Sequence, residues 1–319
     1  MRQASFADLA FDTKKKTTKR ERFLAEMNEV VPWARLLAVL IEPHYPKGER
    51  GRPPLGLETM LRVYLVQQWY ALSDPLVEES LYDSEAVRRF VGLRLGEDAV
   101  PDESTVLQFR RLLERHHLTE RLFADVAGFL AERGLLLSHG TIVDATIIHT
   151  PSSTKNEERQ RDPEMAQTRK GNQYYFGMKA HIGVDARNGL MHRLMTSTAS
   201  TADVTMMDTL LHGGEREVYG DKGYVSEARR RAFKVRGARR WGVARKAKPG
   251  KPLSERDRER NRRLSSVRSK VEHVFRVVKR QFGYVKVRYR GLAKNTAQMF
   301  TMFALSNLYL ARRQLLAIT

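Results

Sequence analysis

Apolar side chains recur at helical spacing through the first 137 residues. One such stripe holds Leu57, Met60, Leu61, Tyr64, Leu65 and Trp69. Residues three and four positions apart lie on the same side of a helix, so the stripe predicts an amphipathic helix that packs inward. Turn-forming residues at 51–55 and cap-forming residues at 101–105 precede further helical segments. The pattern predicts an all-helical N-terminal domain over residues 1–137.

Two interpretations of that domain fit its sequence. A capped turn ahead of a helix at 106–116 is compatible with a helix-turn-helix, which would place Gln108, Arg110 and Arg111 on the helix that enters a DNA groove. The alternative is an all-helical scaffold or dimerisation domain. The spacing of residues does not separate the two.

From Gly140 onward the pattern changes to that of strands. Residues 141–148 are mostly β-branched and apolar, which indicates a buried strand that carries one acid, Asp144. Residues 155–171 are polar and charged, and we expect a mobile loop there. Segments 174–185 and 190–197 flank Asn188-Gly189, the dipeptide of tight hairpin turns, so they predict two antiparallel strands.

The remaining segments alternate between helix and strand. We expect a short helix at 204–211, a strand at 217–219 that ends just before Asp221, a helix at 226–235 and a strand near 240–244. A long helix at 254–282 carries valines every three or four residues, so one side of it packs on the sheet. This alternation predicts an α/β fold. The apolar run at 299–311 is too short to span a bilayer and predicts a core helix.

The composition narrows the partner. The formal net charge is +20 over 319 residues, an excess that calls for a polyanion. No basic amphipathic helix or lipid signal accompanies it at the start of the sequence, so DNA is a better partner than a membrane. The chain has no cysteine, which excludes disulfides, thiolate zinc sites and a cysteine nucleophile. We expect a cytoplasmic protein with no export signal.

The excess charge is concentrated in one segment. Residues 229–290 hold 24 Lys and Arg against 4 Asp and Glu, so the rest of the chain is balanced. A basic disordered tail would lack aromatic residues, whereas Trp241, Phe275, Phe282, Tyr284 and Tyr289 are interspersed here. We therefore interpret the segment as a track for DNA phosphates.

Three acids stand out against these surroundings. Asp144 lies in an apolar strand, where an uncompensated charge is costly to bury. Asp221 lies between glycines that allow close approach, and Glu272 is an isolated acid with Arg268 and Arg276 one helical turn away. A solvent-facing strand end, an Asx-turn and surface salt bridges explain these acids equally well one at a time. Together they match a site in which carboxylates hold two metal ions for phosphodiester chemistry.

At these residues the chain resembles the DDE transposases of bacterial insertion sequences, in the superfamily that contains insertion sequences four and five. The Asp-x-Thr motif corresponds to residues 144–146 and the Asp-(Gly/Lys)-Gly-Tyr motif to residues 221–224. The Arg-x3-Glu-x6-Lys signature corresponds to Arg268, Glu272 and Lys279. Ser265 stands where the signature usually has a tyrosine. The helical region at 51–116 also resembles the N-terminal domain of the five-type group.

The resemblance implies a ribonuclease H-like mixed sheet with flanking helices at 138–319, with a short basic insertion around 236–262. It further implies that Asp144, Asp221 and Glu272 are catalytic and bind two Mg²⁺, with Mn²⁺ as a substitute. We further expect DNA contacts from Arg268, Lys279, Tyr224, Arg276 and Lys222, with Tyr224 stacking on or positioning the end nucleotides. The substrate would be double-stranded DNA, both transposon terminal inverted repeats and target, bound by a homodimer in the bacterial nucleoid.

Several alternatives stay open on the sequence alone. A DNA-end-binding remnant would bind without cutting, a ribonuclease H-like nuclease would cut without joining, and a serine or tyrosine recombinase would form a covalent link to DNA. Asp185 and Asp203 are candidate turn acids, and Lys179 and His181 a candidate strand pair. We leave these four outside the catalytic set.

Overall fold

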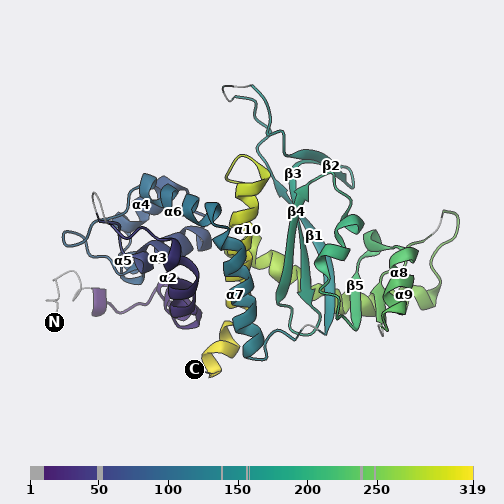
Figure 1. Ribbon diagram of the computed structural model, residues 1–319. Coiled ribbons are helices and arrows are strands. Elements are labelled where there is room, and N and C mark those ends of the chain that lie inside the picture. The colour runs from purple at the N-terminus through teal and green to yellow at the C-terminus, as the bar shows by residue number, and fades with distance from the viewer. Residues whose placement is uncertain are drawn as a thin grey trace. The chain divides into compact units, whose positions relative to one another are not determined.

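The computed structural model describes residues 11–48, 53–137, 139–155, 157, 159–237, 240–247 and 249–318, with 39 and 40 described for their main chain only. The chain divides into two compact units, Met1–Leu118 with Ala311–Thr319, and Thr119–Leu310. Each unit is described by itself below (Figure 1).

The first unit is helical, as predicted for the N-terminal region. Its elements are α2 (Lys19–Val30), η1 (Arg35–Ile41), η2 (Glu42–His44), α3 (Leu57–Trp69), α4 (Asp74–Asp83), α5 (Glu85–Val91) and α6 (Glu103–Arg115). Side-chain caps begin most of these helices: Thr18 and Glu21 form a capping box on α2, and Ser73, Ser84 and Asp102 cap α4, α5 and α6. The predicted stripe lies on α3, which is buried from Met60 to Trp69 except for Arg62.

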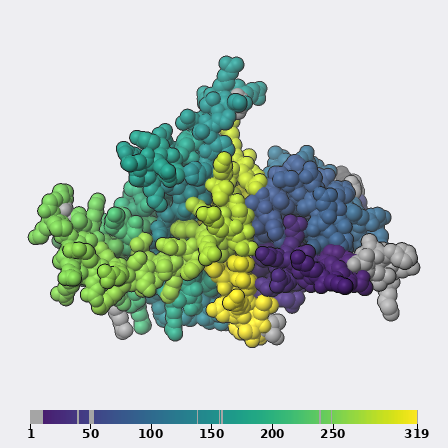
Figure 2. Space-filling view, turned by 180° about the vertical axis from the view of Figure 1, so that it is seen from behind, coloured from purple at the N-terminus to yellow at the C-terminus, as the bar shows by residue number. Residues whose placement is uncertain are grey.

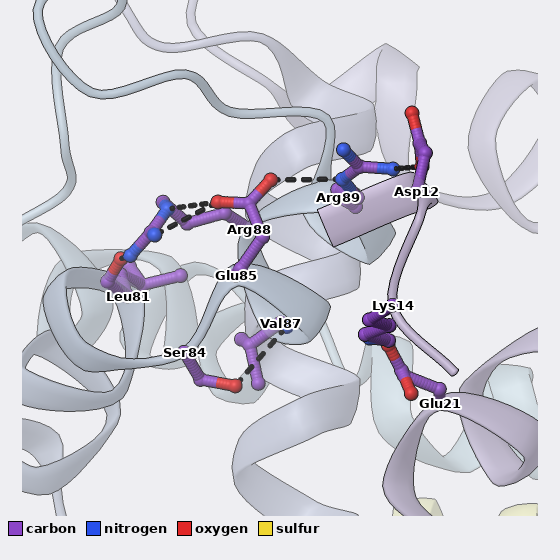
Figure 3. A network of polar contacts seen from close by, with 9 residues as sticks. All are labelled: Asp12, Lys14, Glu21, Leu81, Ser84, Glu85, Val87, Arg88 and Arg89. Carbon is purple, nitrogen blue, oxygen red and sulfur yellow. Dashed lines mark hydrogen bonds and ion pairs between the residues drawn. The ribbon is translucent and has the colours of Figure 1, made fainter. Parts of the chain in front are cut away.

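A network of charged side chains ties the start of the described chain to α5 (Figure 3). Arg89 pairs with both Asp12 and Glu85, and Glu85 also accepts hydrogen bonds from Arg88. The Arg88 guanidinium donates to the Leu81 carbonyl at 2.9 Å as well. Exposed ion pairs of this kind contribute well under about 1 kcal/mol each, so the network positions the segment more than it stabilises the unit.

One residue of the helix-turn-helix interpretation is wrong. Arg110 is buried on α6 and pairs with Asp74 at 2.6 Å, so its guanidinium does not face a DNA groove. The mistake arose because helical periodicity places an arginine on a face without revealing whether a buried acid lies opposite. Gln108 and Arg111 are exposed on the same helix.

The second unit contains one mixed sheet and the helices around it. Its strands are β1 (Gly140–His149), β2 (Ala166–Lys170), β3 (Gln173–Asp185), β4 (Met191–Thr198), β5 (Glu217–Gly220) and β6 (Arg240–Val243). Its helical elements are α7 (Leu118–Glu132), η3 (Asp203–Met206), η4 (Asp208–Leu210), η5 (Lys222–Tyr224), α8 (Glu227–Val235), α9 (Glu255–Arg276), η6 (Val277–Gln281) and α10 (Leu292–Ile318), of which Leu118 and the end of α10 from Ala311 belong to the first unit.

The strand order is β2-β3-β1-β5-β6, with β4 also paired to β3. The first half of the sheet is antiparallel, and β1, β5 and β6 run parallel. The chain can return to a parallel strand only by a crossover, and α8 supplies that connection between β5 and β6. The ribonuclease H-like α/β fold class predicted from the sequence is thus confirmed (Figure 1).

The predicted hairpin is present as β3 and β4. Gly189 takes the left-handed conformation that the turn requires, with φ at 73°. Asp185 is fully buried at the turn and accepts hydrogen bonds from the main-chain N–H groups of Arg187 and Asn188, both at 2.8 Å. It is therefore a turn acid, one of the roles considered for it.

Different elements cover the two faces of the sheet. On one face Val143 and Val218 pack in a core with Leu210, Tyr224 and Phe233, from η4, η5 and α8. On the other lie α9 and α10, whose residues appear in green to yellow in the view from behind (Figure 2). The buried Asn307 of α10 bonds both the N–H and the carbonyl of Met191, at 2.8 and 2.7 Å, and so satisfies the outer edge of β4.

Three local predictions differ from the structure. Strand β2 lies inside the segment expected to be a loop, because its polar side chains conceal an edge strand whose main chain pairs with β3. The helix expected at 204–211 is two 3-10 turns, η3 and η4. The long helix ends in a π-helical turn, η6, and the final helix runs from Leu292 to Ile318. No helix among the described residues is long and apolar enough to cross a membrane.

Candidate active site

Asp144 and Asp221 lie just beyond the residues through which β1 and β5 pair in parallel, Asp144 within β1 and Asp221 directly after β5. Ile142 of β1 pairs with Tyr219 of β5, and each aspartate lies two residues further along its chain. Side chains alternate between faces along extended backbone, so both aspartates lie on the same face, the one that α9 covers. The charge of Asp221 raises the pKa of Asp144, as expected for carboxylates on one face of neighbouring strands.

The backbone around Asp221 holds its carboxylate in place. Asp221 caps η5, where its Oδ1 accepts a hydrogen bond from the Gly223 N–H at 2.7 Å. A Cβ on Gly223 would lie 2.9 Å from that same oxygen. A residue with a side chain at 223 would thus push on the carboxylate, which explains why glycine is needed there.

Burial and negative neighbours weaken the acidity of Asp144. Its side chain is only 22% exposed. Burial above all, with the charges of Asp221 and Asp203, raises the pKa of Asp144 to about 6, against the lowering effect of the Ala145 N–H and of Arg268. A carboxylate in this state gains from any additional positive charge nearby.

Arg268 supplies part of that positive charge. It lies on α9, and its guanidinium Nη2 is 3.5 Å from Asp144 Oδ2. Arg268 is one of the expected DNA contacts, whereas here its contact is with the carboxylate itself. The same residue therefore orients Asp144 and anchors α9 over β1.

Glu272 is placed on the correct helix without joining the two aspartates. It follows Arg268 by one helical turn, whereas Lys279 lies beyond the end of α9, in the π-helical turn η6. Arg268 and Lys279 both contact β1. The Glu272 side chain is exposed, and no group of three His, Asp or Glu among the described residues lies close enough to hold a metal ion.

The Lys279 ammonium is hydrogen-bonded within the protein. Its ammonium donates to Thr146 Oγ1 at 2.6 Å and to the Ile147 carbonyl at 2.9 Å. Burial lowers the pKa of Lys279, and the nearby charge of Lys170 lowers it further. These bonds attach η6, which continues α9, to β1 at the residues two and three positions after Asp144. The sequence signature does not reveal this anchoring role.

Tyr224 is not available for stacking. It is 1% exposed and its ring belongs to the core beneath the aspartates, so the expectation that it stacks on end nucleotides is wrong. The motif at 221–224 specifies a tyrosine at this position but not the direction in which its side chain points. Burial raises its pKa, as do the charges of Asp144 and Asp203. Lys222 and Arg276, the other expected DNA contacts, are both exposed.

Asp203 is a residue of this site that sequence reasoning left aside as a turn acid. It begins η3, and its Oδ1 accepts a hydrogen bond from the Lys179 ammonium at 2.9 Å. His181, fully buried, has its Nδ1 3.9 Å from the same oxygen, and burial lowers the pKa of this histidine to about 4. Nothing in the sequence marks Asp203, because only folding brings η3 near β1.

The donors present suit a hard divalent cation in part. Asp144 and Asp221 offer neighbouring carboxylate oxygens, the ligands that Mg²⁺ prefers. A cation bound beside Asp144 would favour its ionised form, which burial and the charge of Asp221 disfavour. The two aspartates therefore fit such an ion, whereas Glu272 stands apart from them.

Two family models match the chain. The transposase DDE domain covers residues 137–308, and the transposase domain (DUF772) covers residues 11–112. No solved structure matches. Proteins with these domains act on DNA, and the DDE domain implies nuclease and transferase activity in general, typically with divalent metals. Since the DDE match covers more than half of the chain and agrees with the acids, strands and helix described above, the chain belongs to the DDE transposases of insertion sequences.

Proposed function

We propose that this transposase cleaves DNA at the ends of its element and joins the freed 3′ hydroxyl to target DNA. The observation that carries the proposal is the placement of Asp144 and Asp221 on one face of the sheet, just beyond the parallel pairing of β1 and β5. Glu272 is the proposed third carboxylate, because it lies one helical turn after Arg268, which contacts Asp144. We also assign the chain to the four/five superfamily, in its five-type group.

Asp144, Asp221 and Glu272 would hold two Mg²⁺ ions, for which Mn²⁺ would substitute. When bound, these ions would activate the attacking oxygen and stabilise the leaving oxygen of the phosphodiester. Asp144 and Asp221 share one face of the sheet, and Glu272, exposed on α9, would complete the set.

The chain's own residues prepare this chemistry in three ways. Arg268 favours the ionised form of Asp144, which a metal ligand requires. The Gly223 N–H fixes one oxygen of Asp221 and leaves the other free. Lys279 holds α9 against β1, and so sets the height of Glu272 above the sheet.

We further propose the division of labour between regions. Residues 1–137 would bind transposon ends or assemble the complex, and residues 138–319 would carry out catalysis, with a basic insertion at 236–262. Lys222 and Arg276, both exposed, are the proposed phosphate contacts nearest the site. Cutting two ends together needs two active sites, so we propose a homodimer on DNA.

The test is cleavage of a labelled duplex that carries the element's own end, followed by transfer of that end into a plasmid. The reactions contain Mg²⁺, Mn²⁺ or EDTA, and the variants are Asp144→Asn, Asp221→Asn and Glu272→Gln. We expect wild-type cleavage and joining with either metal, none in EDTA, and a loss of at least about 100-fold in each variant with end binding retained.

The outcomes separate the alternatives. Binding without cleavage by folded wild-type protein would mean a DNA-end-binding remnant. Cleavage without joining would mean a nuclease. A covalent protein–DNA adduct would mean a recombinase, and full activity of Glu272→Gln alone would remove that residue from the metal site.

A further inference from the structure

A groove opens beside the catalytic edge, between α8, β6 and the start of α9. It has a volume of about 590 Å³. Its walls include Val225 and Ser226, which directly follow η5, and residues 244–247, which directly follow β6. The Ala244 N–H donates to the Gly220 carbonyl at 3.1 Å, and the residue after Gly220 is Asp221. The groove therefore begins next to Asp221, one of the two proposed catalytic aspartates.

Positive side chains dominate the groove. It is lined by Arg230, Lys234, Arg245, Lys246, Lys251 and Arg260, against only two acids. Both acids are already paired: Glu227 lies 3.4 Å from Arg230, and Asp257 accepts from Arg245. Within the part of the chain that the structure describes, Lys234, Lys246 and Lys251 are exposed and no acid pairs with them. These three lysines can therefore each bind an anion supplied by a ligand.

The framework under these lysines is fixed. Arg260 donates to the carbonyls of Val243 and Trp241, at 3.1 and 2.9 Å, and so joins α9 to the edge strand β6. Burial lowers the pKa of Arg260, and the adjacent charge of Arg245 lowers it further, which reflects the crowding of cations here. An anion bound in the groove would relieve this repulsion.

Two helix ends add to the positive potential. Ser226 caps the N-terminus of α8, Ser254 caps that of α9, and both line the groove. The positive end of each helix dipole therefore lies at the same surface as the lysines. Figure 1 shows α8 and α9 together at the β5 side of the sheet.

We propose that this groove holds the sugar–phosphate backbone of duplex DNA immediately beside the bond that is cut. The inference rests on the proposed function, because it takes the DNA that passes over Asp144 and Asp221 to continue past Val225 into the groove. A run of phosphates matches exposed lysines spread over α8, the loop after β6 and the approach to α9. The lysines near the start of the basic segment at 229–290 would therefore bind the DNA on one side of the bond that is cut.

The test compares two triple variants that remove the same charge. The groove variant is Lys234→Gln/Lys246→Gln/Lys251→Gln. The control is Arg187→Gln/Arg193→Gln/Arg216→Gln, three exposed arginines toward the end of the sheet at which β1 and β5 begin, outside the groove lining. Affinity for a fluorescent duplex of random sequence is measured by anisotropy over a series of salt concentrations. EDTA is present, so that no cleavage occurs and the outcome does not depend on catalysis.

We expect the groove variant to lose about 0.9 from the slope of log affinity against log salt for each phosphate contact removed, about 2 to 3 in all. Its affinity near 0.1 M salt should fall by about 30-fold or more, and that of the control by less than about threefold. Thermal unfolding checks that both variants fold, as expected for exposed side chains.

Equal losses in both variants would overturn the proposal, because net charge alone would then explain them. Unchanged binding of the groove variant would overturn it too. Competition by ATP as strong as by an equal concentration of duplex phosphate would show a nucleotide site instead. A wild-type protein that binds through the groove but never cleaves would refute the proposed function and leave this inference standing.

Discussion

Substitution of Lys279, in η6 directly after α9, tests whether this residue contacts DNA or anchors the helix to β1. Its ammonium makes two hydrogen bonds to β1, at 2.6 and 2.9 Å, and its side chain is partly buried. Lys279→Met keeps the aliphatic stem and removes both bonds. The Ile147 carbonyl, three residues beyond Asp144, then loses its ammonium donor.

The size of the effect follows from these contacts. A hydrogen bond to a charged group contributes about 1.5–3 kcal/mol, and the cost of burying the ammonium offsets part of that. We expect Lys279→Met to lower the free energy of unfolding by about 2 kcal/mol, about 30-fold in the folded-to-unfolded ratio. Urea unfolding followed by circular dichroism measures this. The control, Arg280→Met, removes the next cation along, which is exposed, and should change stability by less than about 0.5 kcal/mol.

DNA binding separates the two roles. An anchor should leave the salt dependence of duplex binding unchanged while cleavage falls, because α9 and Glu272 are no longer held over β1. The reasoning would be refuted if Lys279→Met kept full stability and lost about 0.9 from the salt slope, the loss of one phosphate contact. In that case the Lys279 ammonium would leave Thr146 and Ile147 and contact a DNA phosphate when DNA binds.

Three further predictions concern stability. Burial lowers the pKa of His192 from 6.5 to about 4, with a further contribution from His212, so unfolded protein binds a proton that folded protein does not. Stability is then complete above pH 6.5 and declines toward pH 4, by about 2 kcal/mol between about pH 7 and 5, and His192→Gln should remove this share. Gly177→Ala should cost at least about 3 kcal/mol, because its Cβ would lie 2.1 Å from a β1 carbonyl. Arg110→Met should cost about 2–3 kcal/mol by leaving Asp74 without its buried partner.

Each of these has a matched comparison. The pH dependence of urea unfolding would contradict the first if it were identical in wild type and His192→Gln. Gly171→Ala, at a left-handed position with no atom within 4 Å, should cost only about 1–2 kcal/mol, and an equal cost would contradict the second. For the third, calorimetry of Arg111→Met, an exposed neighbour, should show almost no change, and a larger loss there than in Arg110→Met would contradict it.

The sequence alone was sufficient for the order and type of most elements. Branched residues around Asp144 marked β1, Asn188-Gly189 marked the hairpin, and the valine stripe marked α9. These signals are local, since they depend on periodicity, turn chemistry and side-chain shape within a few residues. Motif spacing also singled out Asp144 and Asp221, which lie in and directly after two strands that pair in parallel.

Only the tertiary structure decided which partner each polar side chain meets. Arg110 was available to DNA by periodicity, yet it is buried against Asp74. Tyr224 lies within a motif, yet its ring packs in the core, and Asp203 carries no motif, yet its charge acts on Asp144. Strand β2 is also invisible locally, because its pairing energy comes from the main chain of β3. Long-range contacts depend on how strands and helices are brought together, and neighbouring residues in the sequence carry no record of that arrangement.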